Sequence, residues 1–155
     1  MLLVKELLGL IPRSLSYLEW EGRYASYRRK YEIDKEFKFN GKNTYVYGDG
    51  RIVLGKRSYL SHGCIVCANH GTKFEVGSDT HIAPYFLAHT VSLDRDRNVV
   101  KGDITIGNNV WIGVHTFVKQ GVTIGNNVVV GANSTVLEDV PDNVLVAGNP
   151  AKVKL

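Results

Sequence analysis

The sequence lacks the features that mark several large classes of protein. It has only two cysteines, Cys64 and Cys67, which form a single C-x-x-C with no second pair. A structural zinc site needs about four ligands, so we interpret both cysteines as small apolar fillers and expect no metal. The positive excess is also small, because 19 Lys and Arg stand against 15 Asp and Glu. Without a recognisable nucleic-acid module, that excess does not indicate a nucleic-acid partner.

A membrane-spanning run is lacking as well. The first residues, MLLVKELLGLI, are apolar but interrupted by Lys5 and Glu6, and the stretch is too short to cross a bilayer. No small-residue cleavage signal follows it. We therefore expect no transmembrane segment and a cytoplasmic location. A chain of 155 residues with ordinary globular composition is the size of a single folded domain.

The first 40 residues differ in pattern from the rest of the chain. Apolar side chains recur there at helical spacing, at Leu3, Leu7, Leu8, Ile11, Leu15 and Leu18. Pro12 interrupts the pattern, and Ser14 can cap a second helix. Tyrosines then alternate with basic residues, which favours a packed helix. The alternative is a basic, aromatic face near a membrane surface or an anionic glycan.

From Leu54 onward the period of the sequence is six residues. An aliphatic side chain opens each of twelve hexads, at positions 54, 60, 66, 76, 82, 88, 106, 112, 118, 124, 130 and 136. Two insertions, 72–75 and 94–105, separate the hexads into three blocks. The repeated phrase TIGNN, at 105–109 and 123–127, is spaced by three hexads. Such a repeat predicts a solenoid of short strands, each hexad sending one aliphatic side chain inward.

The hexads, the phrase GNNVWIG at 107–113 and the ending DVPDNVLVAGNPAKV at 139–153 resemble the hexapeptide-repeat acyltransferases. That family includes O-acetyltransferases of maltose and galactosides and acetyltransferases of bacterial surface polysaccharides. The resemblance covers residues 52–155. It implies a left-handed parallel β-helix, an exception to right-handed crossovers. It also implies a homotrimer with active sites at subunit interfaces, where acetyl-CoA binds between neighbours. We expect an N-terminal helical cap over 1–40 and the β-helix domain over 41–155, with loop 94–105 and a C-terminal tail.

The implied reaction transfers an acetyl group from a thioester by direct attack of the acceptor. A sugar hydroxyl is a poor nucleophile, so a base must remove its proton, and imidazole suits that task near neutral pH. Of the five histidines, His89 breaks the hexad rule, because it occupies a position elsewhere held mostly by Gly, Ala or Ser. It also precedes the excursion 94–105, where the resemblance places the catalytic histidine. We predict His89 as the general base; the alternative is a plain surface histidine.

The other histidines carry weaker signals. His70 is the second candidate for the base, although NHG at 69–71 is more typical of a tight turn. We interpret His62, His81 and His115 as outward or turn residues, with His115 a candidate for lining the groove near the cofactor.

Acceptor contacts are expected from Asp94, His70 and Tyr85. The run DRDR at 94–97 is equally consistent with a solvated loop. The family's sugar acetyltransferases carry an assisting Asn about thirty residues before their histidine, and its nearest counterpart here is Gly63. That helper is therefore absent or replaced, which argues against maltose or a galactoside as the acceptor.

Cofactor contacts follow from the resemblance. Trp111 matches a tryptophan beside the coenzyme A arm, and Gly113, Gly131 and Ala132 match positions along which the arm runs. Small side chains there let an extended arm approach the backbone. Relatives bind the phosphates with a Lys and an Arg, where this chain has Glu138 and Lys152. Lys152 can supply a point charge, and Lys119 and Lys154 are alternatives.

The sequence therefore predicts an acetyl-CoA-dependent O-acetyltransferase acting on a sugar or surface-polysaccharide precursor, with a small-molecule or glycan acceptor. The alternatives are N-acetylation of an amino sugar and a non-catalytic structural solenoid. A third alternative is a zinc enzyme, because carbonic anhydrases share this solenoid. Those enzymes need two histidines about five residues apart, and no pair here has that spacing.

Overall fold

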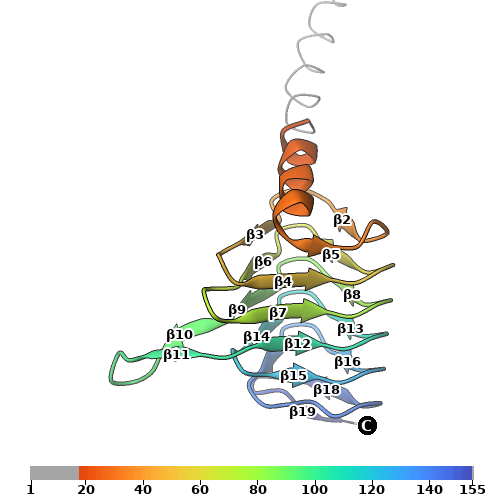
Figure 1. Cartoon of the computed structure of the whole chain (residues 1–155). Coiled ribbons are helices and arrows are strands. Elements are labelled where there is room, and N and C mark those ends of the chain that lie inside the picture. Colours follow the sequence, from red (N-terminus) through yellow and green to blue (C-terminus); the bar gives the residue numbers. More distant parts are fainter. Residues whose placement is uncertain (1–17, 155) are drawn as a thin grey trace, which may run out of the picture.

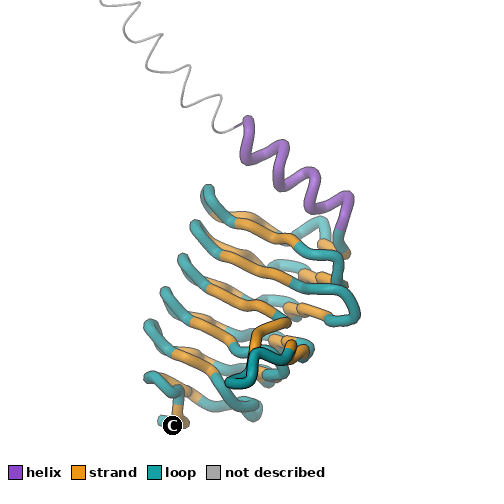
Figure 2. The backbone as a smooth tube through the Cα atoms, turned by 90° about the vertical axis from the view of Figure 1, so that its left-hand side faces the viewer, coloured by secondary structure: helices purple, strands orange, loops and turns teal. Residues whose placement is uncertain are grey.

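The computed structural model describes residues 18–154, which form a helix followed by a left-handed parallel β-helix (Figures 1 and 2). The apolar positions expected to be helical before residue 18 lie outside the described residues. Within the described part, residues 18–30 are helical. The expected fold class is confirmed.

The helix covers the open end of the solenoid with an aromatic stripe. Trp20, Tyr24 and Tyr27 of the helix are buried at the spacing of one helix face, and Tyr31, directly after the helix, is buried as well. Tyr24 stacks on Phe39 of the first coil, with ring centroids 4.4 Å apart. The end of the sheets, whose edges would otherwise be unpaired, is thereby covered.

The β-helix has the shape of a three-sided prism whose sides are three parallel sheets. Five complete coils each contribute one strand to each sheet. The first sheet contains β1 (Glu32–Ile33), β4 (Arg51–Leu54), β7 (Lys73–Val76), β12 (Ile104–Ile106) and β15 (Thr123–Ile124). The second contains β2 (Lys38–Asn40), β5 (Tyr59–Ser61), β8 (His81–Ile82), β13 (Trp111–Ile112), β16 (Val129–Val130) and β18 (Leu145–Ala147), and ends with the antiparallel β19 (Lys152–Val153). The third contains β3 (Tyr45–Tyr47), β6 (Ile65–Cys67), β9 (Leu87–His89), β14 (Phe117–Val118) and β17 (Thr135–Val136).

The core is the column of aliphatic side chains that the hexads predict. All twelve first-position residues are at most 1% exposed. Leu54 pairs with Val76, Val76 with Ile106 and Ile106 with Ile124, so the two insertions leave the inward register intact. The hexad assignment is therefore confirmed over the whole range in which it was made.

The solenoid begins earlier than the boundary expected at residue 41. Strands β1 and β2 already pair in parallel with β4 and β5 of the second coil. The first coil escapes the hexad pattern because Ile33, Phe39 and Val46, the residues paired with Leu54, Leu60 and Val66, are six and then seven residues apart. The helical part of the predicted cap thus ends at residue 30, and the rest of it belongs to the solenoid.

The TIGNN repeat builds the corner between the first and second sheets. Asn126 Oδ1 accepts from the Asn108 backbone N–H at 2.9 Å, and Asp142 Oδ1 accepts from the Asn126 N–H at 2.7 Å. Asn109 and Asn127 form a second row, joined through their amides at 2.9 Å. Asn126 and Asp142 therefore each satisfy a backbone donor of the preceding coil, whereas the second row links side chain to side chain.

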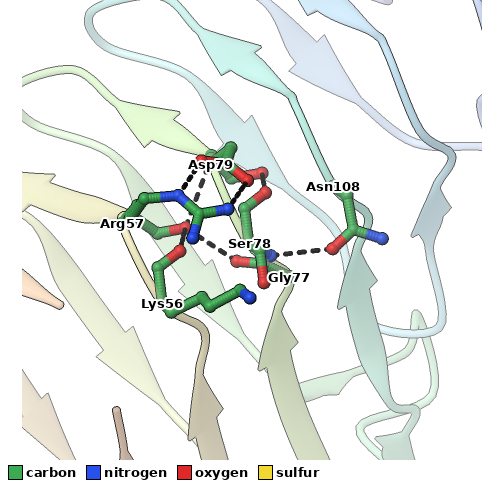
Figure 3. A network of polar contacts seen from close by, with 8 residues as sticks. Lys56, Arg57, Gly77, Ser78, Asp79 and Asn108 are labelled. Atoms are coloured by element: carbon green, nitrogen blue, oxygen red, sulfur yellow. Dashed lines mark hydrogen bonds and ion pairs between the residues drawn. The ribbon is translucent and has the colours of Figure 1, made fainter. Parts of the chain in front are cut away.

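Two coils nearer the N-terminus use other residues at the same corner (Figure 3). The Ser78 N–H still donates to Asn108 Oδ1, at 2.8 Å. In the second row, however, Arg57 and Asp79 replace asparagine and form a bidentate ion pair of 2.6 and 2.7 Å. We call the two rows of side chains at this corner the asparagine ladder. Toward the N-terminus, the second row of the ladder changes from amide groups to a charged pair.

The excursion in the sequence is an antiparallel hairpin that projects from the prism (Figure 1). It consists of β10 (Val91–Leu93) and β11 (Val99–Lys101). The hairpin starts at Val91, before the expected loop start at residue 94, and the wall resumes at Ile104. Leu93 and Val99, which pair across it, are 62% and 61% exposed.

Within residues 18–154 there is no helix with the length and apolarity that a membrane span requires.

Candidate active site

His89 lies at the end of β9, where the chain leaves the third sheet for the hairpin. Its neighbour Ala88 points into the core and is fully buried, so strand alternation directs His89 outward. The Tyr47 hydroxyl lies 3.4 Å from His89 Nε2, and the two rings meet edge-on with centroids 6.1 Å apart. Among the described residues, Nδ1 has no partner. The site therefore holds an oriented imidazole with one nitrogen available.

The row that contains His89 runs across three coils. Tyr47, Cys67 and His89 are paired in register in β3, β6 and β9. Burial, as the largest cause, raises the pKa of the Tyr47 hydroxyl, so the phenol keeps its proton at neutral pH. Sequence reasoning missed Tyr47, because it belongs to the coil that does not follow the hexads. The pairing of Cys67 with His89 follows from the 22-residue register of the second and third coils, 18 residues plus the four-residue insertion.

Neither cysteine is a candidate nucleophile. Burial raises the pKa of the Cys64 thiol to about 11. Burial also raises the pKa of the Cys67 thiol, whose Sγ donates to Asn69 Oδ1 at 2.9 Å. Both thiols therefore stay protonated at neutral pH, and the thiolate that nucleophilic attack requires is scarce.

The base of the hairpin is attached to the prism by buried hydroxyls and side-chain bonds. Thr90 and Thr72 share a hydroxyl contact of 2.5 Å, and Gln120 Nε2 donates to Ser92 Oγ at 2.6 Å. Because Thr90 directly follows His89, these contacts fix the backbone that carries the imidazole.

Asp94 is in the turn of the hairpin, and the His70 carbonyl accepts from Lys101 Nζ at 3.2 Å. Neither residue contacts His89 among the described residues. The Asp94 carboxylate closes the hairpin tip by accepting from the backbone N–H groups of Asp96 and Asn98, both at 2.8 Å. The bond from Asn98 is the largest cause that lowers the pKa of the Asp94 carboxyl. The His70 side chain is 87% exposed, and its Nδ1 is 3.8 Å from Asp49 Oδ2. Asp94 thus has a turn-forming role.

Trp111 is on the outer face of the second sheet. It is 49% exposed and lies between His81 and Val129 in the row of paired residues. The His81 ring meets the indole edge-on, with centroids 6.0 Å apart. A shallow hollow of about 210 Å³ lies along these residues and the corner asparagines.

The close packing of successive coils explains why glycine is present at 113 and 131. A Cβ on Gly113 would lie 2.5 Å from the Ala132 nitrogen, and one on Gly131 would lie 2.9 Å from the Ala147 Cβ. Close stacking of successive coils therefore requires glycine at 113 whether or not a ligand binds there. Ala132 is exposed beside this corner. At the C-terminal end, Lys152 Nζ pairs with Glu138 Oε2 at 3.2 Å.

Tyr85 lies at the corner between the second and third sheets. Its φ is 62°, in the left-handed region that bulky side chains rarely adopt. A Cβ on Gly63 would lie 2.7 Å from two ring carbons of Tyr85, so the ring covers that glycine. The imidazoles of His62 and His115 flank the ring, with centroids 5.5 and 4.8 Å away.

The candidate residues fall into two groups on one chain. Trp111 lies on the outer face of the second sheet, whereas His89 lies on that of the third. The outer faces of a three-sided prism point in different directions, so a single chain does not bring the two groups together.

The hexapeptide repeats and the left-handed β-helix that they build are those of the hexapeptide-repeat transferases. The family model described as "Bacterial transferase hexapeptide (six repeats)" matches residues 103–138. The galactoside O-acetyltransferase of Escherichia coli K12 is 34% identical over 139 residues, which are 81% of this chain and 67% of that enzyme. A putative acetyltransferase of Saccharomyces cerevisiae is 37% identical over 113 residues, 69% of this chain and 56% of that protein. The chain thus spans between about half and two thirds of the length of these relatives.

Solved structures give the same result. A maltose O-acetyltransferase from Clostridium difficile 630 superposes with a TM-score of 0.74 and 30% identity, covering 88% of this chain and 75% of that one. An acetyltransferase from Vibrio cholerae O1 biovar eltor, solved with acetyl-CoA, has a TM-score of 0.66 and 28% identity, covering 86% of this chain and 75% of that one. The protein belongs to the hexapeptide-repeat acetyltransferase family, which confirms the resemblance.

Proposed function

We propose that the protein transfers the acetyl group of acetyl-CoA to a hydroxyl of a sugar or surface-polysaccharide precursor, with His89 as the general base. The observation that carries this proposal is the environment of His89. The imidazole is directed outward and oriented by Tyr47, and it stands on a backbone fixed at the base of the hairpin. Family membership supplies the reaction class.

His89 acts on the acceptor proton. In this proposal Nε2–H donates to the Tyr47 hydroxyl oxygen, which leaves the lone pair on Nδ1. Nδ1 then takes the proton of the acceptor hydroxyl as the acceptor oxygen bonds to the acetyl carbonyl carbon. When bound, acetyl-CoA supplies the acetyl group as an activated thioester. The carbon–sulfur bond then breaks, and the proton on His89 passes to the departing sulfur. The products are an acetyl ester and a free thiol, with the imidazole neutral again.

The residues proposed to hold the coenzyme fit an extended ligand. Trp111 offers a half-exposed indole, and the exposed Val114 and Val129 add apolar surface nearby. Ala132 and the glycines at 113 and 131 leave the corner free of large side chains. Lys152 supplies a cation at the C-terminal end, where Glu138 competes for it. Tyr85, His70 and Asp94 are on the acceptor side in this proposal, Asp94 through the shape of the hairpin.

The proposal includes a homotrimer, in which His89 of one subunit would face Trp111 of the next. In a closed three-fold ring the same two surfaces meet at each interface. The hairpin carries the exposed apolar pair Leu93 and Val99, which a neighbouring subunit can cover.

The test is thiol release from acetyl-CoA by wild type and by His89→Ala, assayed with sugar acceptors. We expect a loss of roughly 10²- to 10⁴-fold, the usual contribution of a general base. The thermal shift produced by coenzyme A should be unchanged, because His89 lies on a different sheet from the coenzyme residues.

Three results would redirect the proposal. Loss of activity in His70→Ala, with His89→Ala unaffected, would move the base to His70. Turnover with amino sugars alone would favour N-acetylation. No turnover and no thermal shift with coenzyme A in wild type would favour a structural solenoid.

A further inference from the structure

The corner between the second and third sheets has one residue that does not suit its backbone. In each coil, one residue at this corner has a positive φ, in the left-handed region of backbone conformation. These residues are Asn43, Gly63, Tyr85, His115 and Asn133. Asparagine and glycine adopt this conformation readily, whereas a tyrosine does so at a cost of about 1–3 kcal/mol. Strain of this kind persists where the surrounding structure holds it, often at a functional site.

The structure around Tyr85 is arranged to hold the ring in one place. Gly63 leaves the space that the ring occupies, since any Cβ there would lie 2.7 Å from its carbons. His62 and His115 flank the ring on the coils above and below. Even so, the residue is 49% exposed. An aromatic ring is therefore fixed against the corner with much of its surface available to a ligand.

The level of Tyr85 along the solenoid places it next to the reacting group. On the proposed function, the coenzyme extends from Lys152 in the last coil past Ala132 in the fifth and Gly113 in the fourth. Tyr85 belongs to the third coil, the next one on this line and about 10 Å from the level of Ala132 at the usual strand spacing. His89 is in the same coil as Tyr85. A three-fold axis along the solenoid would bring the neighbour's His89 to that level.

We propose that Tyr85 is a specificity-determining residue: its ring, held over Gly63, is the platform on which the pyranose ring of the acceptor stacks. This inference rests on the proposed function. The apolar C–H face of a pyranose packs against the face of an aromatic ring. The imidazoles of His62 and His115 provide hydrogen-bonding groups for the hydroxyls at the rim. Few polar groups around an aromatic wall are typical of small-ligand sites.

The experiment compares Tyr85→Asn and Tyr85→Phe with wild type. Asparagine is the residue that this corner carries at Asn43 and Asn133, so the substitution suits the backbone. The probes are methyl β-D-galactoside, maltose, methyl N-acetyl-glucosaminide and glucosamine, each with acetyl-CoA. For Tyr85→Asn we expect the acceptor KM to rise roughly tenfold, the order of one aromatic contact. The KM for acetyl-CoA should stay unchanged, and the Tm should be unchanged or higher.

The phenylalanine variant isolates the role of the ring. Tyr85→Phe should keep the acceptor KM within about twofold of wild type, because stacking needs no hydroxyl. Arg57→Asn is the matched control, since it also replaces a left-handed residue by asparagine, at the other corner. It should leave both KM values unchanged.

Gly63→Ala tests the coupling of the two positions. The added Cβ displaces the ring. Gly63→Ala alone should therefore raise the acceptor KM, whereas Gly63→Ala added to Tyr85→Asn should raise it no further. An unchanged acceptor KM in Tyr85→Asn would overturn the inference alone, as would an equal loss in Tyr85→Phe. Absence of any turnover and of a coenzyme A thermal shift in wild type would instead overturn the proposed function, and this inference with it.

Discussion

At the scale of single residues, Tyr85 occupies a corner position that three of the other four coils give to Asn or Gly. His89 could be predicted because its position in the hexad is elsewhere mostly Gly, Ala or Ser and because it precedes the excursion 94–105. The strain at Tyr85 could not be predicted, because the hexads give no backbone angle. Its left-handed φ and its contact with Gly63 are properties of the folded corner. The contact between Tyr47 and His89 was likewise beyond prediction, since Tyr47 lies outside the hexad register.

Gly113 is a residue with two possible roles, in coil stacking and in coenzyme binding. We expect Gly113→Ala to lower the Tm in the absence of any ligand, because its Cβ would lie 2.5 Å from the Ala132 nitrogen. Gly107→Ala is the matched control, because its Cβ would lie 2.7 Å from the Gly125 carbonyl oxygen at another corner. Each should cost about 1–3 kcal/mol, the usual cost of overpacking. Differential scanning fluorimetry measures both.

The comparison also separates the two roles. Coenzyme A should raise the Tm of Gly107→Ala as it does that of wild type, and raise that of Gly113→Ala less. Equal ligand shifts in the two variants would leave Gly113 with the stacking role alone.

At the scale of elements, the hexad wall was predictable and its first coil was not. Twelve inward positions follow from the hexads because each coil repeats the same contact with the next. The first coil lacks that regularity, since Phe39 and Val46 are seven residues apart. The excursion was recognised from the interruption of the repeat. That it forms a hairpin from Val91 was not recognised, because Val91 and Leu93 also suit a wall strand.

The tip of that hairpin should respond to acid. The Asp94 pKa is lower in the folded chain than its ordinary value of 3.8. The carboxylate therefore contributes its full stabilisation above pH 3.8, and the contribution is lost as the pH falls through the lowered folded-state pKa. Amide exchange at Asp96 and Asn98 should accelerate over that range relative to the wall. Asp94→Ala should show the faster exchange already at neutral pH. Exchange in the variant as slow as in wild type would contradict this role.

At the scale of the whole molecule, the exposed apolar residues are the candidate contacts between subunits of the proposed trimer. Leu93 and Val99 form a cross-strand pair on an arm that projects from the prism. A trimer would cover them and would bring together the two groups of site residues that one chain keeps apart.

Charges on this arm should prevent assembly without unfolding the solenoid. We expect the double variant Leu93→Asp with Val99→Asp to sediment as a monomer where wild type sediments as a trimer. Its circular dichroism should match wild type, since neither side chain belongs to the core. The control is Arg95→Asp, on the same hairpin, which should remain trimeric. Wild type that sediments as a monomer would exclude the shared site.

The asparagine ladder has a consequence for how long such a molecule can be. Asn126 gives the coil above it the same acceptor that Asp142 gives to Asn126 itself. Each coil therefore presents to the next coil the same hydrogen-bonding groups, so that a further coil could pack on it in the same way. Nothing within the ladder sets a length. Growth is limited at one end by the aromatic helix and at the other by β19, which runs antiparallel and offers the next coil no matching partner. In this protein the two end segments limit the stack of coils, and the repeat determines only how one coil packs on the next.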